Sequence, residues 1–170
     1  IVGIEQMDKD SATGKPYVMA NPSYADLPLI GAGGPNNAPD PEKILAVRPD
    51  VIFSTYGADR AFGDNLQGKT GIPVVAISYG KTAVFDPDMY DSIKLIGKIT
   101  GEEQRAQAIV DHMEDWRRDL DYRTKDIPDD EKPRVYMGAL NMRGSHGIES
   151  TQGNYALFNA VHAKNVVDEL

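Results

Sequence analysis

One stretch of the sequence, residues 39–57, restricts the fold more than any other because it encodes a helix, a turn and a strand in succession. Asp40 suits the N-cap of the helix and Pro41 its first position, since a side-chain acceptor and a fixed φ are favoured there. Arg48 precedes a proline and is therefore predicted to end the helix. Residues 51–53 form an unbroken apolar run, which is typical of a strand buried on both faces.

The carboxyl end of this strand is the place where we expect a ligand. Tyr56 and Gly57 follow it closely, and Tyr79 follows a second strand predicted over 72–77. Strands that alternate with helices favour a parallel sheet with helices on both faces, and such sheets bind ligands outside the carboxyl ends of their strands. We expect both tyrosines to face one crevice, where they stack on an aromatic ligand or bind a metal through phenolate. The alternative is that they cap the core of the sheet.

The other predicted elements continue the mixed pattern. We expect a first strand over 1–4, a short helix from residue 21, a strand over 29–30, and a helix or turn after Gly57 as far as Leu66. After a polar linker we expect a strand over 134–138, and residues 151–154 are predicted to lead into a helix that carries Tyr155. Apolar spacing also predicts a helix from residue 88 and a second one through Arg123 that begins with a capping box of Thr100 and Glu103. A second helix of about 20 residues would span about 30 Å, which suits a strut between two lobes.

Two helices are predicted to bury an apolar side. For the helix that begins at Pro41, these residues are Ile44, Leu45 and Val47. For the long helix, they are Ala106, Ile109, Val110, Met113, Trp116 and Leu120.

Composition narrows the class of partner. The net charge of −8 comes from 18 basic and 26 acidic residues without a basic run, which argues against nucleic acid or anionic lipid. No apolar stretch approaches the roughly 20 residues of a membrane span. The chain has no cysteine, which fits an oxidising compartment without disulfides as well as the cytosol. It begins without methionine in an apparent strand, so we expect a trimmed or processed product.

Three local motifs could indicate a phosphate-binding loop, a metal site or a catalytic nucleophile. The glycines of residues 31–34 do not have the spacing of a phosphate-binding loop, so we interpret Gly33 as part of a flexible loop that borders the crevice. His146 lies on a loop without a second histidine, a cysteine or paired carboxylates nearby, which disfavours a protein metal site. His146 either contacts a bound ligand or bonds to the backbone. Ser145 lacks the Gly-x-Ser-x-Gly spacing of a nucleophile, and no acid–base pair stands out. We therefore expect no catalytic residue, no cofactor and no enzyme.

Five segments in the same order resemble a known family. Residues 41–52 are similar to the EKILALKPDLVI signature of substrate-binding proteins of ABC importers for iron complexes and cobalamin. The remaining four are similar to the next strand, the segment before the long helix, the strand that opens the second lobe, and the loop and helix of that lobe: residues 71–75, 96–101, 133–136, and 144–151 with 163–167. The resemblance runs nearly end to end.

The resemblance implies an α/β fold with a parallel-sheet, Rossmann-like lobe, a long connecting helix and the start of a second α/β lobe. The implied boundaries are 1–88 for the ligand-binding lobe, 89–125 for the interlobe helical region and 134–170 for a partial C-terminal lobe. It also implies truncation, a periplasmic or extracellular location, and anchoring as a lipoprotein in the complete protein.

The same resemblance implies a function. The protein would capture an iron complex, a siderophore or haem, between its lobes and deliver it to a membrane permease, with Glu42 matching the acidic docking residue of the first lobe. The candidate ligand-binding residues are Gly33, Tyr56, Gly57, Tyr79, Ser145 and His146. The alternatives are a cobalamin or metal-oxyanion binder of the same family, or an α/β enzyme that uses the same crevice.

Overall fold

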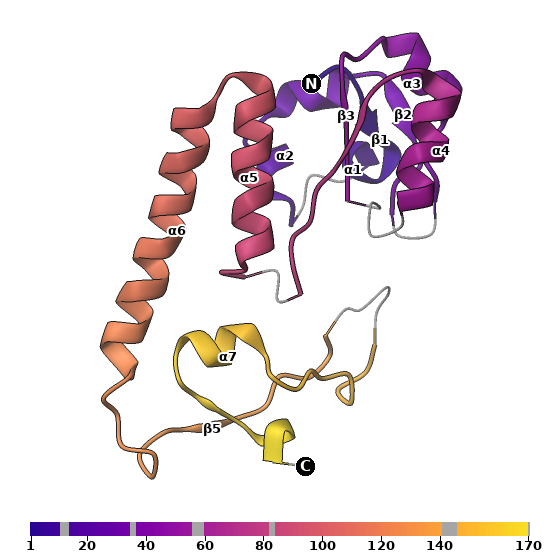
Figure 1. The fold of residues 1–170 in the computed structure, drawn as a ribbon. Coiled ribbons are helices and arrows are strands. Elements are labelled where there is room, and N and C mark those ends of the chain that lie inside the picture. Colours follow the sequence, from indigo (N-terminus) through magenta and orange to yellow (C-terminus); the bar gives the residue numbers. More distant parts are fainter. Residues whose placement is uncertain (11–13, 35–36, 56–59, 82–83, 141–145, 170) are drawn as a thin grey trace. The chain divides into compact units, whose positions relative to one another are not determined.

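The computed structural model describes residues 1–170 except 11–13, 35–36, 56–59, 82–83, 141–145 and 170 (Figure 1). The described strands form three parallel pairs: β1 (Ile4–Glu5) with β2 (Leu29–Gly31), β3 (Ile52–Ser54) with β4 (Val74–Ala76), and β5 (Arg134–Val135) with β6 (Lys164–Asn165). The predicted fold class, α/β with parallel strands and long helices, is confirmed.

Two compact units make up the chain, Ile1–Ile77 and Ser78–Leu170. The helices of the first unit are α1 (Gln6–Asp10), α2 (Pro16–Met19), the 3-10 helix η1 (Pro22–Asp26), α3 (Pro41–Val47) and α4 (Arg60–Thr70). Those of the second unit are α5 (Pro87–Thr100), α6 (Glu103–Thr124), α7 (Ala156–Ala160) and the 3-10 helix η2 (Val166–Glu169).

Helix α3 begins where the sequence predicts. The carboxylate of Asp40 accepts hydrogen bonds from the backbone N–H groups of Glu42 (3.1 Å) and Lys43 (3.2 Å), and Pro41 occupies the first turn. The helix ends at Arg48, whose φ of 46° lies in the left-handed region. The prediction that Leu45 is buried is wrong, because Leu45 is 43% exposed and Ile44 only 3%. Neighbouring residues of a helix point about 100° apart, so both cannot face the same partner elements.

The strands are shorter and less buried than predicted. Ile1 and Val2 are 83% and 48% exposed, and pairing starts at Ile4, whose N–H donates to the carbonyl of Pro28 (2.9 Å). Ile52 and Phe53 are half-buried instead of buried on both faces. Among the described strands β3 pairs only with β4, so the sheet is too small to enclose both faces of β3 as a wider sheet would.

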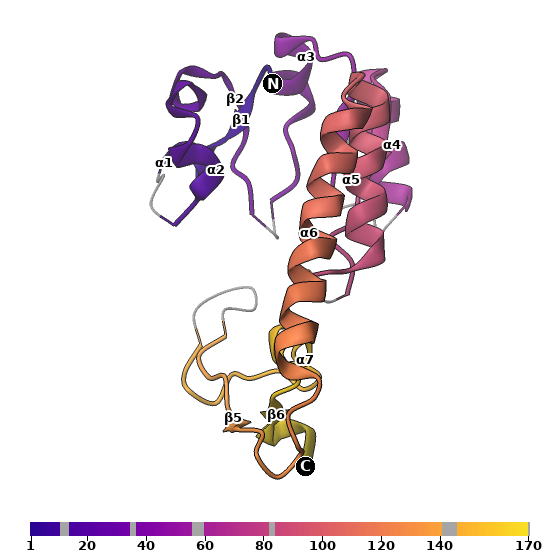
Figure 2. The same ribbon diagram turned by 90° about the vertical axis from the view of Figure 1, so that its left-hand side faces the viewer.

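The longest elements of the second unit, α5 and α6, run side by side in both views (Figures 1 and 2). Gly97 of α5 permits this close approach, since a Cβ on Gly97 would lie 2.4 Å from the Cβ of Ala106 on α6. At about 1.5 Å per residue, the 22 residues of α6 extend about 33 Å. None of the helices formed by the described residues is long and apolar enough to cross a membrane.

The predicted capping box between the two helices is absent. Thr100 is the last residue of α5, and its hydroxyl donates to the carbonyl of Ile96 (2.8 Å) instead of capping α6. Gly101, with a φ of 75°, ends α5, and Glu102 occupies the N-cap of α6 without a side-chain bond. The Thr-x-x-Glu pattern was misplaced because α5 continues through Thr100, whose hydroxyl is already used within that helix.

The apolar face of α6 is narrower than predicted. Ala106 and Val110 are buried, whereas Ile109 and Trp116 are 37% and 55% exposed. The Trp116 ring lies against the ring of His112 on the same helix, with 4.4 Å between their centroids. Helix α5 covers only part of the circumference of α6, so Ile109 and Trp116 remain at the surface of the described structure.

Candidate functional site

Three of the six predicted ligand-binding residues can be placed: Gly33 in the first unit, and Tyr79 and His146 in the second. Tyr56, Gly57 and Ser145 lie outside the described residues. The gathering of these six residues around one crevice therefore stays a prediction.

Gly33 forms a close corner with the end of β1. It is buried with a φ of 75°, and a Cβ there would lie 2.6 Å from Oε2 of Glu5, so a side chain could not replace it without moving that carboxylate. The side-chain amide of Asn37 donates to the carbonyl of Gly33 (2.6 Å). Burial and, secondarily, the charge of Asp8 raise the pKa of Glu5 above its usual value.

Near Glu5, the carboxylate of Asp8 interacts with two side chains, and none of these three residues was predicted as part of a site. The hydroxyl of Tyr17 donates to Oδ1 of Asp8 (2.7 Å), and the Lys15 ammonium lies 3.4 Å from the same oxygen. The bond to Asp8 is the main reason why the pKa of Tyr17 is raised to about 12, so Tyr17 is a neutral phenol near pH 7. The sequence does carry one signal for this region, since the carboxylate of Glu5 directly follows the strand predicted over 1–4.

A phosphate loop before α3 is disfavoured by the cap geometry. The N–H groups that such a loop would turn toward a phosphate are bonded to the carboxylate of Asp40, whose pKa is lowered chiefly by the N–H of Lys43. A carboxylate in this position also repels an anion. Within the described part of the chain, no group of three or more histidine, cysteine or acidic residues could hold a metal ion.

Tyr79 follows β4 and lies in a turn whose backbone is held by hydrogen bonds. Its side chain is 61% exposed. The N–H of Gly80 donates to the hydroxyl of Ser78 (2.9 Å), and the N–H of Lys81 donates to Oδ2 of Asp86 (2.9 Å). An exposed phenol with a fixed backbone can stack on a flat ligand or donate one hydrogen bond.

His146 is also exposed, and the residues that follow it are held in place by hydrogen bonds. The Tyr136 hydroxyl donates to the carbonyl of Ile148 (2.6 Å), and the backbone N–H of Leu140 donates to the carbonyl of Ser150 (3.1 Å). These bonds hold the residues after His146 against those that follow β5. His146 itself makes a contact with the rest of the chain, in line with either interpretation of this residue.

A pocket of about 300 Å³ lies between α6 and α7 in the second unit, and its lining residues are Val84, Phe85, Arg117, Asp121, Ala156, Asn159, Ala160 and His162. Nε2 of His162 lies 2.9 Å from Oδ1 of Asp121, which links the end of α7 to α6. His162 is half-buried. The polar side chains that line the pocket already have partners within the protein, so the pocket is largely apolar.

Glu42, the predicted docking residue, is exposed in the first turn of α3. Its backbone N–H is bonded to the carboxylate of Asp40, so the cap fixes the position of its backbone. The position fits both a contact with a basic partner and a favourable interaction with the helix dipole.

The fold defines an α/β protein with parallel strand pairs and one long helix. The chain belongs to the periplasmic binding protein family, whose sequence model matches residues 3–170.

Two curated relatives of bacterial origin are similar to it. The substrate-binding lipoprotein YvrC of an uncharacterized ABC transporter of Bacillus subtilis is 23% identical over 124 residues, which are 73% of this chain and 39% of YvrC. The molybdate-binding protein MolA of Haemophilus influenzae is 27% identical over 150 residues, which are 79% of this chain and 41% of MolA. The chain thus spans about two fifths of the length of these curated relatives.

Solved structures agree with this assignment. MolA bound to molybdate matches with a TM-score of 0.62 at 27% identity, covering 81% of this chain and 46% of that one. The TroA-like periplasmic binding protein FepB of Veillonella parvula matches with a TM-score of 0.65 at 24% identity, covering 99% of this chain and 50% of that one. The second likeness supports the fold alone.

Proposed function

We propose that the complete protein is the solute-binding component of an ABC importer and that it captures an iron complex, a siderophore or haem, between two lobes. The observation that carries the proposal is the family match across residues 3–170. The protein would act in the periplasm or outside the cell, anchored as a lipoprotein, and hand its ligand to a membrane permease. Within it, residues 1–88 would form the ligand-binding lobe, 89–125 the interlobe region and 134–170 the start of the second lobe.

The proposed mechanism is capture without chemistry. Tyr79 would offer a ring face and a hydroxyl, and His146 an imidazole, in place of the water around the ligand. Gly33, Tyr56, Gly57 and Ser145 would complete the contacts as small or aromatic groups at the ends of strands and in loops. In this proposal α6 limits how far the lobes can move, because a continuous helix of 22 residues resists bending.

A metal oxyanion is the second candidate ligand, and the similarity to MolA favours it. An oxyanion accepts hydrogen bonds, so it would use the hydroxyl of Tyr79 and backbone N–H groups. A siderophore or haem offers flat conjugated surfaces, so it would use the ring of Tyr79. The two candidates therefore assign different parts of the same side chain.

Isothermal titration of the complete protein with a ferric catecholate siderophore, haemin and molybdate tests the proposal. We expect a ferric complex to bind, and Tyr79→Ala to weaken binding by more than about 1 kcal/mol if the ring stacks. Tyr79→Phe keeps the ring and removes the hydroxyl, so it would spare a stacked iron complex and weaken an oxyanion. Tyr122→Ala is the matched control, because Tyr122 is 75% exposed on α6. Absence of heat with every ferric complex would contradict the iron assignment.

The proposed docking role of Glu42 is tested by charge reversal. Glu42→Arg should leave the ligand affinity unchanged and reduce uptake by cells, because the contact with a basic permease surface becomes repulsive. Glu103→Arg reverses an exposed charge in the first turn of α6 and serves as the control. Normal uptake with Glu42→Arg would remove Glu42 from the docking surface.

A further inference from the structure

The turn that carries Tyr79 is seated on the first turn of α5. The carboxylate of Asp86, which is only 9% exposed, accepts a hydrogen bond on each of its two oxygens. Its Oδ1 accepts from the N–H of Asp88 (3.0 Å) and thereby caps α5, while its Oδ2 accepts from the N–H of Lys81 (2.9 Å). One side chain thus joins the start of a helix to the turn before it.

A second side chain fastens the other end of the same turn. The hydroxyl of Ser92 accepts from the N–H of Ser78 (2.8 Å) and donates to the carbonyl of Asp88 (2.9 Å). Tyr79 therefore lies between two backbone groups, those of Ser78 and Lys81, that are each bonded to a side chain of the 86–92 segment.

The packing against Asp86 is very close. Gly80 has a φ of 74°, and a Cβ there would lie 2.0 Å from Cγ of Asp86. Any other residue at this position would overlap the carboxylate, and a φ in the left-handed region already favours glycine. The turn is therefore shaped around the side chain of Asp86.

We propose that Asp86 and Ser92 are positioning residues, which hold the 78–81 turn on α5 and so fix the ring of Tyr79 for its ligand. This inference rests on the proposed function of Tyr79 in ligand binding. An exposed ring gains little from its own packing, so its direction depends on the backbone that carries it. A turn that is already ordered before binding loses less entropy when the ligand arrives, and the affinity rises accordingly.

Asp86→Asn separates this role from helix stability. Asparagine caps helices about as well as aspartate, so α5 should keep its start and the melting temperature should change little. The amide group has one acceptor oxygen in place of two, so the N–H of Lys81 loses its partner. Ser92→Ala removes the acceptor at the other end of the turn. Asp88→Asn is the matched control, since it removes one exposed negative charge from the same helix turn.

Three measurements on the complete protein decide the matter. Exchange of the Lys81 amide proton should become severalfold faster in Asp86→Asn than in the control. The ¹⁹F signal of fluorotyrosine at position 79, assigned with Tyr79→Phe, should narrow as the ring gains motion. The affinity for the ferric catecholate, haemin or molybdate, whichever binds, should fall about three- to tenfold in Asp86→Asn and in Ser92→Ala.

The outcomes separate the positioning role of Asp86 from the identity of the ligand. With Tyr79→Ala as the background, Asp86→Asn should have no further effect on affinity, because nothing remains to be positioned. Unchanged amide exchange and an unchanged ¹⁹F signal in the free protein would overturn the positioning role, whatever binds. If those two signals change while none of the three probes binds, the proposed iron and oxyanion ligands fail and the influence of Asp86 on Tyr79 stands. If affinity falls equally in the Tyr79→Ala background, Asp86 acts on binding by another route and the inference is wrong.

Discussion

Helices α3 and α6, one from each unit, are stabilised in different ways. Helix α3 has seven residues, a side-chain cap from Asp40 and one buried residue, Ile44, which is 3% exposed. Helix α6 has 22 residues and no side-chain cap, and of its described residues only Ala106 and Val110 are buried. An isolated helix shorter than about 12 residues is marginal in water, so α3 depends on its cap and on packing.

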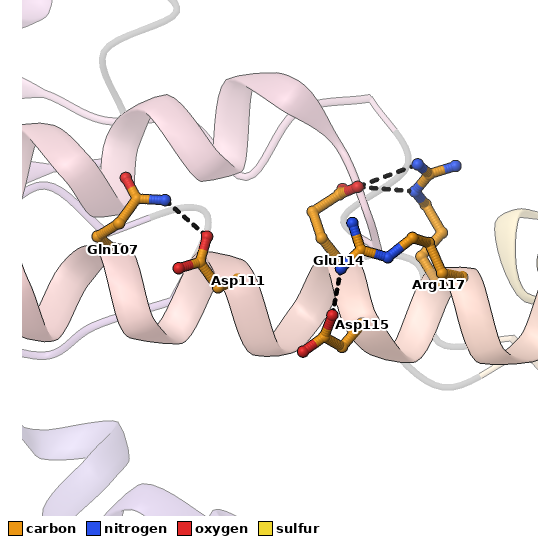
Figure 3. A network of polar contacts seen from close by, with 6 residues as sticks. Gln107, Asp111, Glu114, Asp115 and Arg117 are labelled. Atoms are coloured by element: carbon orange, nitrogen blue, oxygen red, sulfur yellow. Dashed lines mark hydrogen bonds and ion pairs between the residues drawn. The ribbon is translucent and has the colours of Figure 1, made fainter.

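Helix α6 compensates for its small buried face with pairs along its own surface (Figure 3). Glu114 accepts from Arg117 (3.0 Å) and Asp111 from Gln107 (2.7 Å), while Arg118 pairs with Asp115. Each such pair contributes only a few tenths of a kcal/mol, but they are all local and form with the helix. Helix α3 is therefore stabilised mainly by the burial of Ile44 and by its cap, whereas α6 is stabilised by its length and by many weak side-chain pairs along its own surface.

The largest effect is expected at the buried residue of α3. Ile44→Ala should lower the free energy of unfolding by about 2–4 kcal/mol, because it removes buried methyl groups and leaves a cavity. Leu45→Ala is the control, and since Leu45 is 43% exposed it should cost less than about 0.5 kcal/mol. Urea unfolding of the complete protein measures both. Equal effects of the two variants would show that α3 is not held by one contact.

An intermediate effect is expected where α6 meets α5. Gly97→Ala should destabilise by about 1–3 kcal/mol, because the added Cβ would lie 2.4 Å from that of Ala106 and the helices must separate. Gly68→Ala in α4 adds the same methyl group where no atom lies within 4 Å, so it should stabilise by up to about 1 kcal/mol. Opposite signs in thermal unfolding support close packing at Gly97, and a gain in stability from both substitutions would contradict it.

The smallest effect is expected from the surface pairs of α6. Glu114→Gln should cost less than about 1 kcal/mol near pH 7, because the pair with Arg117 is partly exposed and screened. Arg117 holds the pKa of Glu114 below 4.5, so the folded state favours the charged form and gains stability above that pH. This gain is lost as the pH falls below 4.5 and through the lowered pKa.

Unfolding curves of Glu114→Gln and the parent protein should therefore converge in acid. Glu103→Gln, which removes a charge from the first turn of the same helix, provides the comparison. A difference that persists unchanged well below pH 4 would show that the effect of Glu114 is not electrostatic.

Local features of the fold were predicted well from the sequence. Asp40 and Pro41 specify the start of α3 through a bond and a dihedral angle that involve only near neighbours, and the structure has both. The start of α5 was predicted within one residue from the apolar spacing after residue 88, and the structure adds the cap by Asp86 that this spacing does not show. The Thr100 capping box failed because two helices compete for the residues around it, and a pattern of four letters does not say which helix wins.

The candidate site was predicted less completely. The position of Tyr79 after a strand follows from the strand pattern, but its exposure and the bonds of its turn to Asp86 and Ser92 do not, because those bonds join residues 5 to 14 positions apart. The Glu5 and Gly33 corner likewise depends on how β1 pairs with β2.

The sequence by itself determined the class of fold, the cap of α3 and the approximate length of α6, since these follow from patterns within a few residues along the chain. Only the tertiary structure decided that Leu45 and Trp116 are exposed, that Gly97 lies against Ala106, and that Asp86 supports the turn of Tyr79. Each of these depends on which surfaces meet in space, and the apolar pattern of one helix does not contain that information.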